Sequence, residues 1–154
     1  MSTRPAFIVP LEVAATDIQM GHVNNVAFVR FVQEAAVAHW QAAAPEELQR
    51  QYLWVVRRHE IEYLRPGMPG ESLHARTWVG EPSGASWERL TDIVRTADGE
   101  VLVQARTLWV LLDGATGRPR RVLPEMIASL GGGGLPDGAA PPRPVAADAS
   151  PRGS

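Results

Sequence analysis

The sequence predicts an α+β fold in which an antiparallel sheet of about five strands wraps around one long buried helix. The segment Val26–Ala43 contains neither glycine nor proline and is apolar around most of its circumference, which is typical of a buried helix. One extended segment precedes it and four follow, separated by short turns, which is typical of antiparallel strands. The apolar face of the sheet must be covered, and the helix must be buried on most sides. Both requirements are met when the sheet packs around the helix.

The strands and shorter helices are expected at definite places. The first strand, Phe7–Val13, contains Pro10, which favours an edge position or a bulge. Pro45 is expected to begin a short second helix. Pro124–Leu130 is expected to form a short closing helix. The four later strands are predicted at Trp54–Leu64, Ser72–Gly80, Ser86–Thr96 and Val101–Leu112.

The last predicted strand is apolar on both of its faces near its end. Trp109 and Leu111 fall on one face, and Leu108, Val110 and Leu112 on the other. A sheet with one solvent-facing side would carry polar residues there. We therefore expect one face to cover the helix and the other to be partly buried, as by a partner subunit.

Length and composition indicate one domain, and the start of the chain, which lacks a secretory leader pattern, leads us to expect it in the cytoplasm. We expect this domain over residues 1–130, followed by a disordered tail over 131–154, which is rich in Gly, Pro and Ala and lacks periodic apolar residues. The net charge of −2 argues against nucleic acid as a partner. No uncharged apolar run approaches the roughly 20 residues that span a bilayer, and no secretory leader pattern begins the chain. We therefore expect no membrane association.

Several reaction classes are excluded by residue types that the chain lacks. There is no cysteine, which excludes disulfides, thiol catalysis and cysteine-ligated zinc. All basic residues other than histidine are arginine, so lysine Schiff bases and the P-loop lysine are excluded as well. No G-x-S-x-G run marks a serine nucleophile.

A polar segment immediately before the long helix holds the main candidate site. Asp17-Ile-Gln-Met-Gly-His-Val-Asn-Asn25 carries an acid, a histidine, a glycine and two asparagines. Asn24 or Asn25 is a plausible N-cap. The free N–H groups of the first helical turn, at the positive end of the helix dipole, can stabilise a developing oxyanion. Gly21 allows close approach of substrate or a positive φ.

The run Gly21-His22-Val23-Asn24-Asn25, the apolar helix after it and the later Glu62-Tyr63-Leu64-Arg65-Pro66 resemble the hot-dog-fold thioesterases, in the 4-hydroxybenzoyl-CoA thioesterase-like and acyl-carrier-protein thioesterase-like branch. The resemblance spans roughly residues 7–130. It implies a hot-dog fold, a protomer that forms homodimers or homotetramers, and hydrolysis of an acyl-CoA or acyl-carrier-protein thioester. It also implies no metal and no cofactor, with coenzyme A present only as part of the substrate.

The resemblance assigns roles to the residues of this segment. Asp17 would activate water or attack the carbonyl, and His22, Asn25 and the N–H groups of Val26 and Ala27 would hold the oxyanion. Further substrate contacts are expected at Gln19, Gly21 and Asn24. Glu34, on the polar stripe of the helix, is a reserve catalytic acid.

This chain departs from the family pattern at the acid. Related enzymes carry an acid four residues before the histidine, where this chain has Ile18. Either Asp17 swings into the catalytic place, or the acid is missing and Gln19 only holds water or the carbonyl. In the second case the protein would be a non-catalytic module that binds acyl thioesters. A hot-dog dehydratase is a weaker alternative, because its usual signatures are not evident.

Purely structural roles stay open for the same residues. Asp17 could be a turn residue, His22 could pin the loop, Asn25 could be a cap, and Glu34 could pair with Arg30 one turn earlier.

Four basic side chains are candidate contacts for the nucleotide end of coenzyme A. His59 lies in a predicted strand, and Arg118, Arg120 and Arg121 form the densest basic cluster, which suits phosphate binding. The alternative for all four is a solvated surface. The tryptophans on strands are expected in the core or an interface, or along an acyl tunnel.

Overall fold

The computed structural model describes residues 6–131. The predicted disordered tail over 131–154 lies outside the described residues, apart from Gly131.

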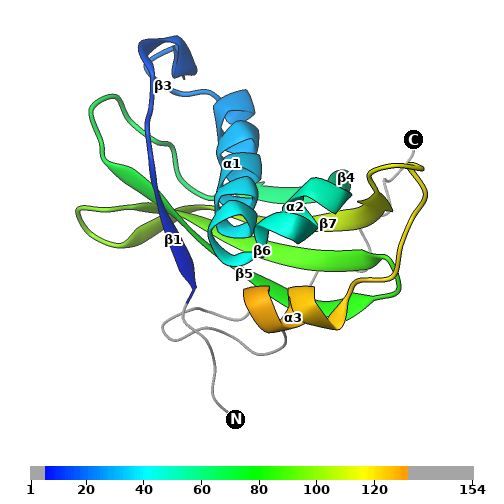
Figure 1. The fold of residues 1–154 in the computed structure, drawn as a ribbon. Helices are drawn as coiled ribbons and strands as arrows, with labels where there is room; N and C mark the ends of the chain where they lie inside the picture. Colours follow the sequence, from blue (N-terminus) through cyan, green and yellow to red (C-terminus); the bar gives the residue numbers. More distant parts are fainter. Residues whose placement is uncertain (1–5, 132–154) are drawn as a thin grey trace, which may run out of the picture.

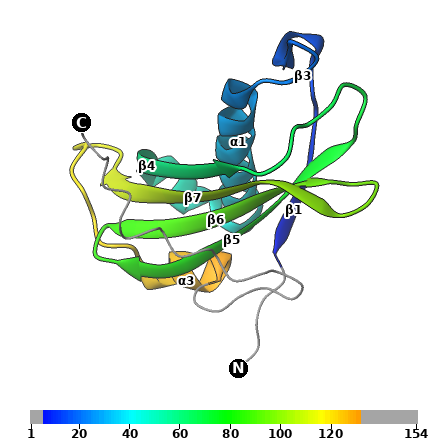
Figure 2. The same ribbon diagram turned by 180° about the vertical axis from the view of Figure 1, so that it is seen from behind.

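One five-stranded antiparallel sheet dominates the structure. Its order is β1-β5-β6-β7-β4. The strands are β1 (Phe7–Leu11), β4 (Tyr52–Tyr63), β5 (Leu73–Ser83), β6 (Ser86–Arg95) and β7 (Glu100–Asp113). The sheet curves around the long helix, and all three helices lie on the same side of it (Figures 1 and 2). These α-helices are α1 (Asn25–Ala43), α2 (Glu46–Gln51) and α3 (Pro124–Leu130), and a single 3₁₀ turn, η1 (Ala15–Asp17), follows β1.

The predicted fold class is therefore confirmed, with small differences at element ends. β1 lies at a sheet edge, as its proline indicated, but stops two residues before Val13. Pro45 is the N-cap of α2 and not its first helical residue. Tyr52 opens β4 two residues before the expected start, because its backbone pairs with Asp113 at the end of β7.

Two apolar clusters fill the space between helices and sheet. The first contains buried residues of α1 and of the strands facing it, with Phe31 and Ala35 fully buried. The second lies between α2, α3 and the neighbouring ends of β5, β6 and β7, around Leu111 and Met126. Buried polar side chains on the inward face of the sheet separate the two. They are Thr77, Arg89, Thr91 and Thr107.

The other face of the sheet is apolar along β4 and the end of β7. Leu53 and Val55 are 54% and 42% exposed, and they are in register with Leu112 and Val110. The two-faced pattern expected for the last strand is therefore present. Burial of this face by a partner subunit stays a prediction.

No helix within residues 6–131 combines the length and apolar character needed to cross a membrane.

Candidate functional site

The polar segment before α1 contains a small hairpin that the sequence did not indicate. β2 (Ile18–Gln19) pairs with β3 (His22–Val23), and Met20 and Gly21 form the turn. Their φ values are 53° and 84°. Two successive positive φ values are typical of the tight hairpin turns that favour glycine. The hairpin projects beyond the N-terminal end of α1 (Figure 1).

Backbone and side-chain bonds fix this hairpin against the start of α1. The Val23 N–H donates to the carbonyl of Gly67 and the Asn24 N–H to the carbonyl of Asp17, each at 2.8 Å. Asn24 is the N-cap, and its side-chain oxygen accepts the Ala27 N–H at 2.7 Å. The choice that the sequence left open between two asparagines is thus resolved in favour of Asn24, a residue expected to contact substrate.

The cap decides which helix N–H groups can bind an oxyanion. Ala27 was expected to supply one, but its N–H is already used by Asn24, so it is not free for substrate. The N–H groups of Asn25 and Val26 have no hydrogen-bond partner among residues 6–131. Val26 is 77% exposed. Two adjacent N–H donors are therefore presented at an accessible helix N-terminus.

Asp17 is held by three donors. Arg30 contacts both carboxylate oxygens at 2.8 Å, and the Ala14 N–H donates to Oδ2 at 2.9 Å. The hydrogen bonds from Arg30 and then from Ala14 lower the pKa of Asp17 from 3.8 to about 2. The residue is only 3% exposed. A carboxylate that is buried, bonded at both oxygens and weakly basic is poorly placed to take a proton from water or to attack a substrate.

The expected pair between Arg30 and Glu34 is confirmed, with Nε to Oε1 at 3.1 Å. Arg30 therefore bridges two acids, one buried and one about half exposed. Asp17 was predicted to be a catalytic group independent of the Arg30–Glu34 pair, but it belongs to the same ion-pair cluster.

His22 and Asn25 carry accessible polar side chains where the hairpin meets α1. His22 Nδ1 lies 3.2 Å from the carbonyl oxygen of Val23. Because a carbonyl only accepts, Nδ1 carries the proton in this contact and Nε2 keeps a free lone pair in the neutral ring. The Asn25 side chain has no hydrogen-bond partner within the described range. Gln19 lies beside His22 in the hairpin, and both are exposed.

The second stretch of the family resemblance meets the first in space. The Tyr63 hydroxyl, at the end of β4, donates to the carbonyl oxygen of Asn25 at 3.4 Å. Its ring lies 6.2 Å from that of Phe28 on α1. The hairpin, the helix start and the end of β4 therefore form one junction.

The remaining predicted contacts are not at this junction. His59 lies half-buried on the inward side of β4, where its ring nitrogens are 2.9 Å from Thr107 Oγ1 and 3.3 Å from Gln33 Nε2. Arg120 pairs with Asp113, which is in register with Tyr52, the first residue of β4. The junction contains Tyr63, the last residue of the same strand. β4 has 12 residues, so its two ends lie roughly 36 Å apart at the usual rise.

Arg118 and Arg121 are exposed in the same loop after β7. Within one protomer the three arginines of this cluster therefore lie far from the junction.

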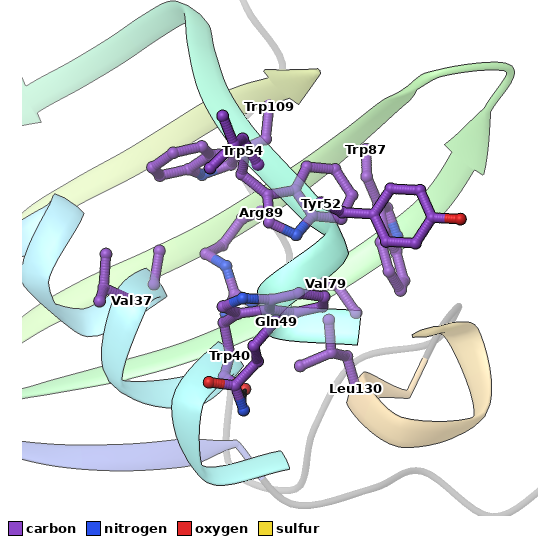
Figure 3. A pocket seen from close by; sticks show the side chains of 12 residues that line it. Val37, Trp40, Gln49, Tyr52, Trp54, Val79, Trp87, Arg89, Trp109 and Leu130 are labelled. Carbon is purple, nitrogen blue, oxygen red and sulfur yellow. Dashed lines mark hydrogen bonds between the residues drawn. The ribbon is translucent and has the colours of Figure 1, made fainter. Parts of the chain in front are cut away.

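A second feature, whose place in the fold was not predicted, is an aromatic cavity of about 230 Å³. It lies where the second half of α1 meets α2, the start of β4 and α3 (Figure 3). Trp40 and Trp54 meet edge to face with ring centres 5.8 Å apart, and Trp54 lies 6.2 Å from Trp87. Three strand tryptophans line the cavity, in line with the tunnel alternative considered for them. They are Trp54, Trp87 and Trp109.

Arg89 reaches into this cavity from β6 (Figure 3). It is 5% exposed, and its Nη1 lies 3.0 Å from both His39 Nδ1 and Thr77 Oγ1. Since a guanidinium only donates, His39 accepts at Nδ1, so its ring is neutral with the proton on Nε2. The ring also stacks on Phe7 at 4.7 Å. Burial, followed by the charge of Arg89, lowers the pKa of His39 from 6.5 to about 3.

This depressed pKa predicts a loss of stability in mild acid. Between pH 6.5 and pH 3 the unfolded chain binds a proton at His39 that the folded chain excludes, so the free energy of unfolding falls as pH falls. From pH 7 to pH 4 we expect a loss on the order of 2 kcal/mol from this residue, allowing for solvent screening. Urea titrations of wild type and His39→Gln at both values measure it. The same loss in the variant would contradict the assignment.

Within residues 6–131 no three His, Asp or Glu side chains come together as a metal site. The expectation that no metal or cofactor is needed stays a prediction.

A curved antiparallel sheet around a long helix, with a capped helix start behind a short polar hairpin, defines the hot-dog class of proteins. The family model for the thioesterase-like superfamily matches residues 13–130. The chain belongs to this superfamily.

Similar solved structures agree with the fold. A thioesterase from Thermus thermophilus, in complex with coenzyme A and zinc, is 25% identical with a TM-score of 0.70, covering 83% of this chain and 98% of that one. The 12:0-acyl-carrier-protein thioesterase from Umbellularia californica is 20% identical with a TM-score of 0.68, covering 82% and 49%.

A palmitoyl-acyl carrier protein thioesterase from Gossypium hirsutum is 23% identical over 115 residues, which are 75% of this chain and 28% of that protein. The chain thus spans little more than a quarter of that relative.

Proposed function

We propose that the protein hydrolyses an acyl thioester at the junction of the hairpin with α1. The observation that carries the proposal is the pair of unpartnered N–H groups at Asn25 and Val26, beside the accessible side chains of His22 and Asn25. Donors fixed in this way favour the tetrahedral oxyanion that forms during acyl transfer. Membership of the thioesterase-like superfamily supports the same reaction.

His22 is the proposed general base. Its Nε2 takes a proton from water while the water oxygen bonds to the thioester carbon, and the carbonyl electrons move onto the oxygen. The N–H groups of Asn25 and Val26 bind that oxyanion. When the intermediate collapses, the carbon–sulfur bond breaks, and the departing sulfur takes the proton from His22 Nε2. The products are the free acid and the thiol.

Asp17 is proposed as a positioning residue. Its carboxylate fixes Arg30, and its backbone carbonyl accepts the Asn24 N–H, so it connects hairpin and helix. The competing assignment, in which Asp17 itself activates water, needs the carboxylate to leave Arg30. Glu34 is accessible but is hydrogen-bonded to the same arginine. We retain it as a further candidate for the catalytic acid.

The substrate class is proposed from the relatives. One solved thioesterase holds coenzyme A, and the plant relatives act on acyl carrier protein, so either carrier is compatible with this chain. The homodimer or homotetramer and the cytoplasmic location remain predictions of the sequence. The exposed apolar residues of β4 are consistent with a subunit contact.

Release of free thiol from a panel of acyl-CoA and acyl-carrier-protein substrates tests the proposal. We expect turnover with at least one substrate and an accumulation of free acid equal to the thiol. Tight binding of several substrates without turnover would instead support the alternative of a non-catalytic acyl-thioester binding protein.

A further inference from the structure

Two residues that line the cavity between α1 and the sheet, Arg89 and Trp109, carry hydrogen-bond donors without acceptors. Arg89 uses both hydrogens of Nη1, on His39 and Thr77. A guanidinium has five N–H groups, and the three on Nε and Nη2 have no acceptor among residues 6–131. Trp109 adds an indole N–H that is buried without a partner.

The charge of Arg89 is also uncompensated within the described part of the chain. It forms no ion pair there, and its two acceptors are a neutral imidazole and a hydroxyl. No acidic residue lines the cavity. A buried cation without an anion is costly. A buried charged group of this kind in a cleft is a candidate functional site.

The side chains that line the cavity indicate the chemical character of the uncharged part of the ligand. Four of the five tryptophans of the chain line it, together with Tyr52. The space of about 230 Å³ is mostly bounded by apolar side chains. Such a site suits an apolar body with one anionic group at its end.

The interface between α1 and β4 extends from the junction to the cavity. α1 contacts β4 at three places, in the reverse order of the strand's sequence: Asn25 with Tyr63, Gln33 with His59 and Trp40 with Trp54. Val26 lies at the start of this interface and Val37, a cavity residue, eleven positions further on, roughly 16 Å along the helix. An extended acyl group attached at the junction could therefore place its far end in the cavity.

We propose that this cavity binds a carboxylate at the far end of an apolar acyl group, with Arg89 as the residue that recognises the charge. Two parallel N–H···O bonds from Nε and Nη2 would hold the carboxylate, a geometry that arginine provides and lysine does not. That the ligand is an acyl group rests on the proposed thioesterase function. The preference of the cavity for a carboxylate does not.

The first test measures binding alone. The probes are 4-phenylbutanoate and its primary amide, which match in size and differ in charge, titrated by calorimetry. In wild type we expect the acid to bind at least tenfold more tightly than the amide. Arg89→Met should bind both equally, and Arg89→Lys should keep only part of the preference. Arg106→Met is the control, because Arg106 pairs in register with Leu90 and lies on the opposite face of the sheet.

Several outcomes overturn the proposal. They are equal binding of acid and amide by wild type, binding of neither at millimolar concentration, and a preference that survives in Arg89→Met. Circular dichroism spectra establish that each variant is folded, and Arg89→Lys keeps the test valid where Arg89→Met does not fold.

The second test joins the cavity to catalysis. Acyl-CoA substrates of equal length, ending in a carboxylate or a methyl group, are compared by kcat/KM. We expect the carboxylate-ended substrate to be favoured in wild type and not in Arg89→Met. If no thioester is cleaved but the acid preference in binding holds, the proposed function fails and the carboxylate site stands. Cleavage of both substrates with equal kcat/KM would reject the carboxylate as part of the acyl group.

Discussion

Replacement of His22 by Gln should lower kcat for thioester hydrolysis by about 10²–10⁴-fold, the usual contribution of a general base. KM should change little, because the N–H groups of Asn25 and Val26 that bind the carbonyl belong to the backbone. Release of free thiol from the best substrate of the panel measures both constants. Because the His22 ring is exposed, added imidazole should restore part of the activity of His22→Ala.

Two variants make this prediction specific. His74→Gln is the matched control, since His74 lies on β5 and its ring bonds Thr96, which is not a residue of the hairpin, the start of α1 or the end of β4. It should retain wild-type activity. Asp17→Asn keeps one acceptor oxygen, which at the Oδ2 position can take the Ala14 N–H and one Arg30 N–H but loses the second Arg30 bond. It should keep kcat within about tenfold of wild type if Asp17 only positions its neighbours. A loss of kcat in Asp17→Asn as large as that in His22→Gln, in a folded protein, would make Asp17 the base.

The fold was predictable from the sequence because the residue patterns that indicate its helix and strands extend over many residues. The apolar circumference of α1 extends over more than four turns, and each strand from β4 to β7 ends at a turn containing Gly or Asp. The hairpin at Met20 and Gly21 was not predictable in this way. Its strands have two residues each, too few to show alternation, and only the Gly21 φ was anticipated.

The candidate site was only partly predictable, because its geometry depends on contacts distant in sequence. The helix start and its cap were local and were anticipated. Asp17 meets Arg30 thirteen residues later, and the sequence had assigned that arginine to Glu34 alone. Arg89 meets His39 fifty residues away. One signal was available, since Arg89 alternates in β6 with the buried Trp87 and therefore shares its inward face.

The Arg30–Asp17 pair should dominate the stability of the junction. Arg30→Met removes two of the three donors of a carboxylate that stays buried, and an uncompensated buried charge is strongly unfavourable. We expect the melting temperature at pH 7 to fall by several degrees. The double variant Asp17→Asn/Arg30→Met should recover much of this loss, because it leaves no charge unpaired. The control is Arg50→Met, which breaks an exposed ion pair with Glu46 and should change the melting temperature by about 1 °C or less.

The acid limb of the stability curve tests the same pair independently. The folded pKa of Asp17, about 2, lies below its ordinary value of 3.8. Between these values the unfolded chain binds a proton that the folded chain does not, so the contribution of Asp17 is complete above pH 4 and is lost as pH falls through 2. Wild type should therefore lose stability in this window, and Asp17→Asn should lose less. Parallel curves for the two proteins would show that the carboxylate is not held by Arg30 in solution, and the junction would then be free to present Asp17 to substrate.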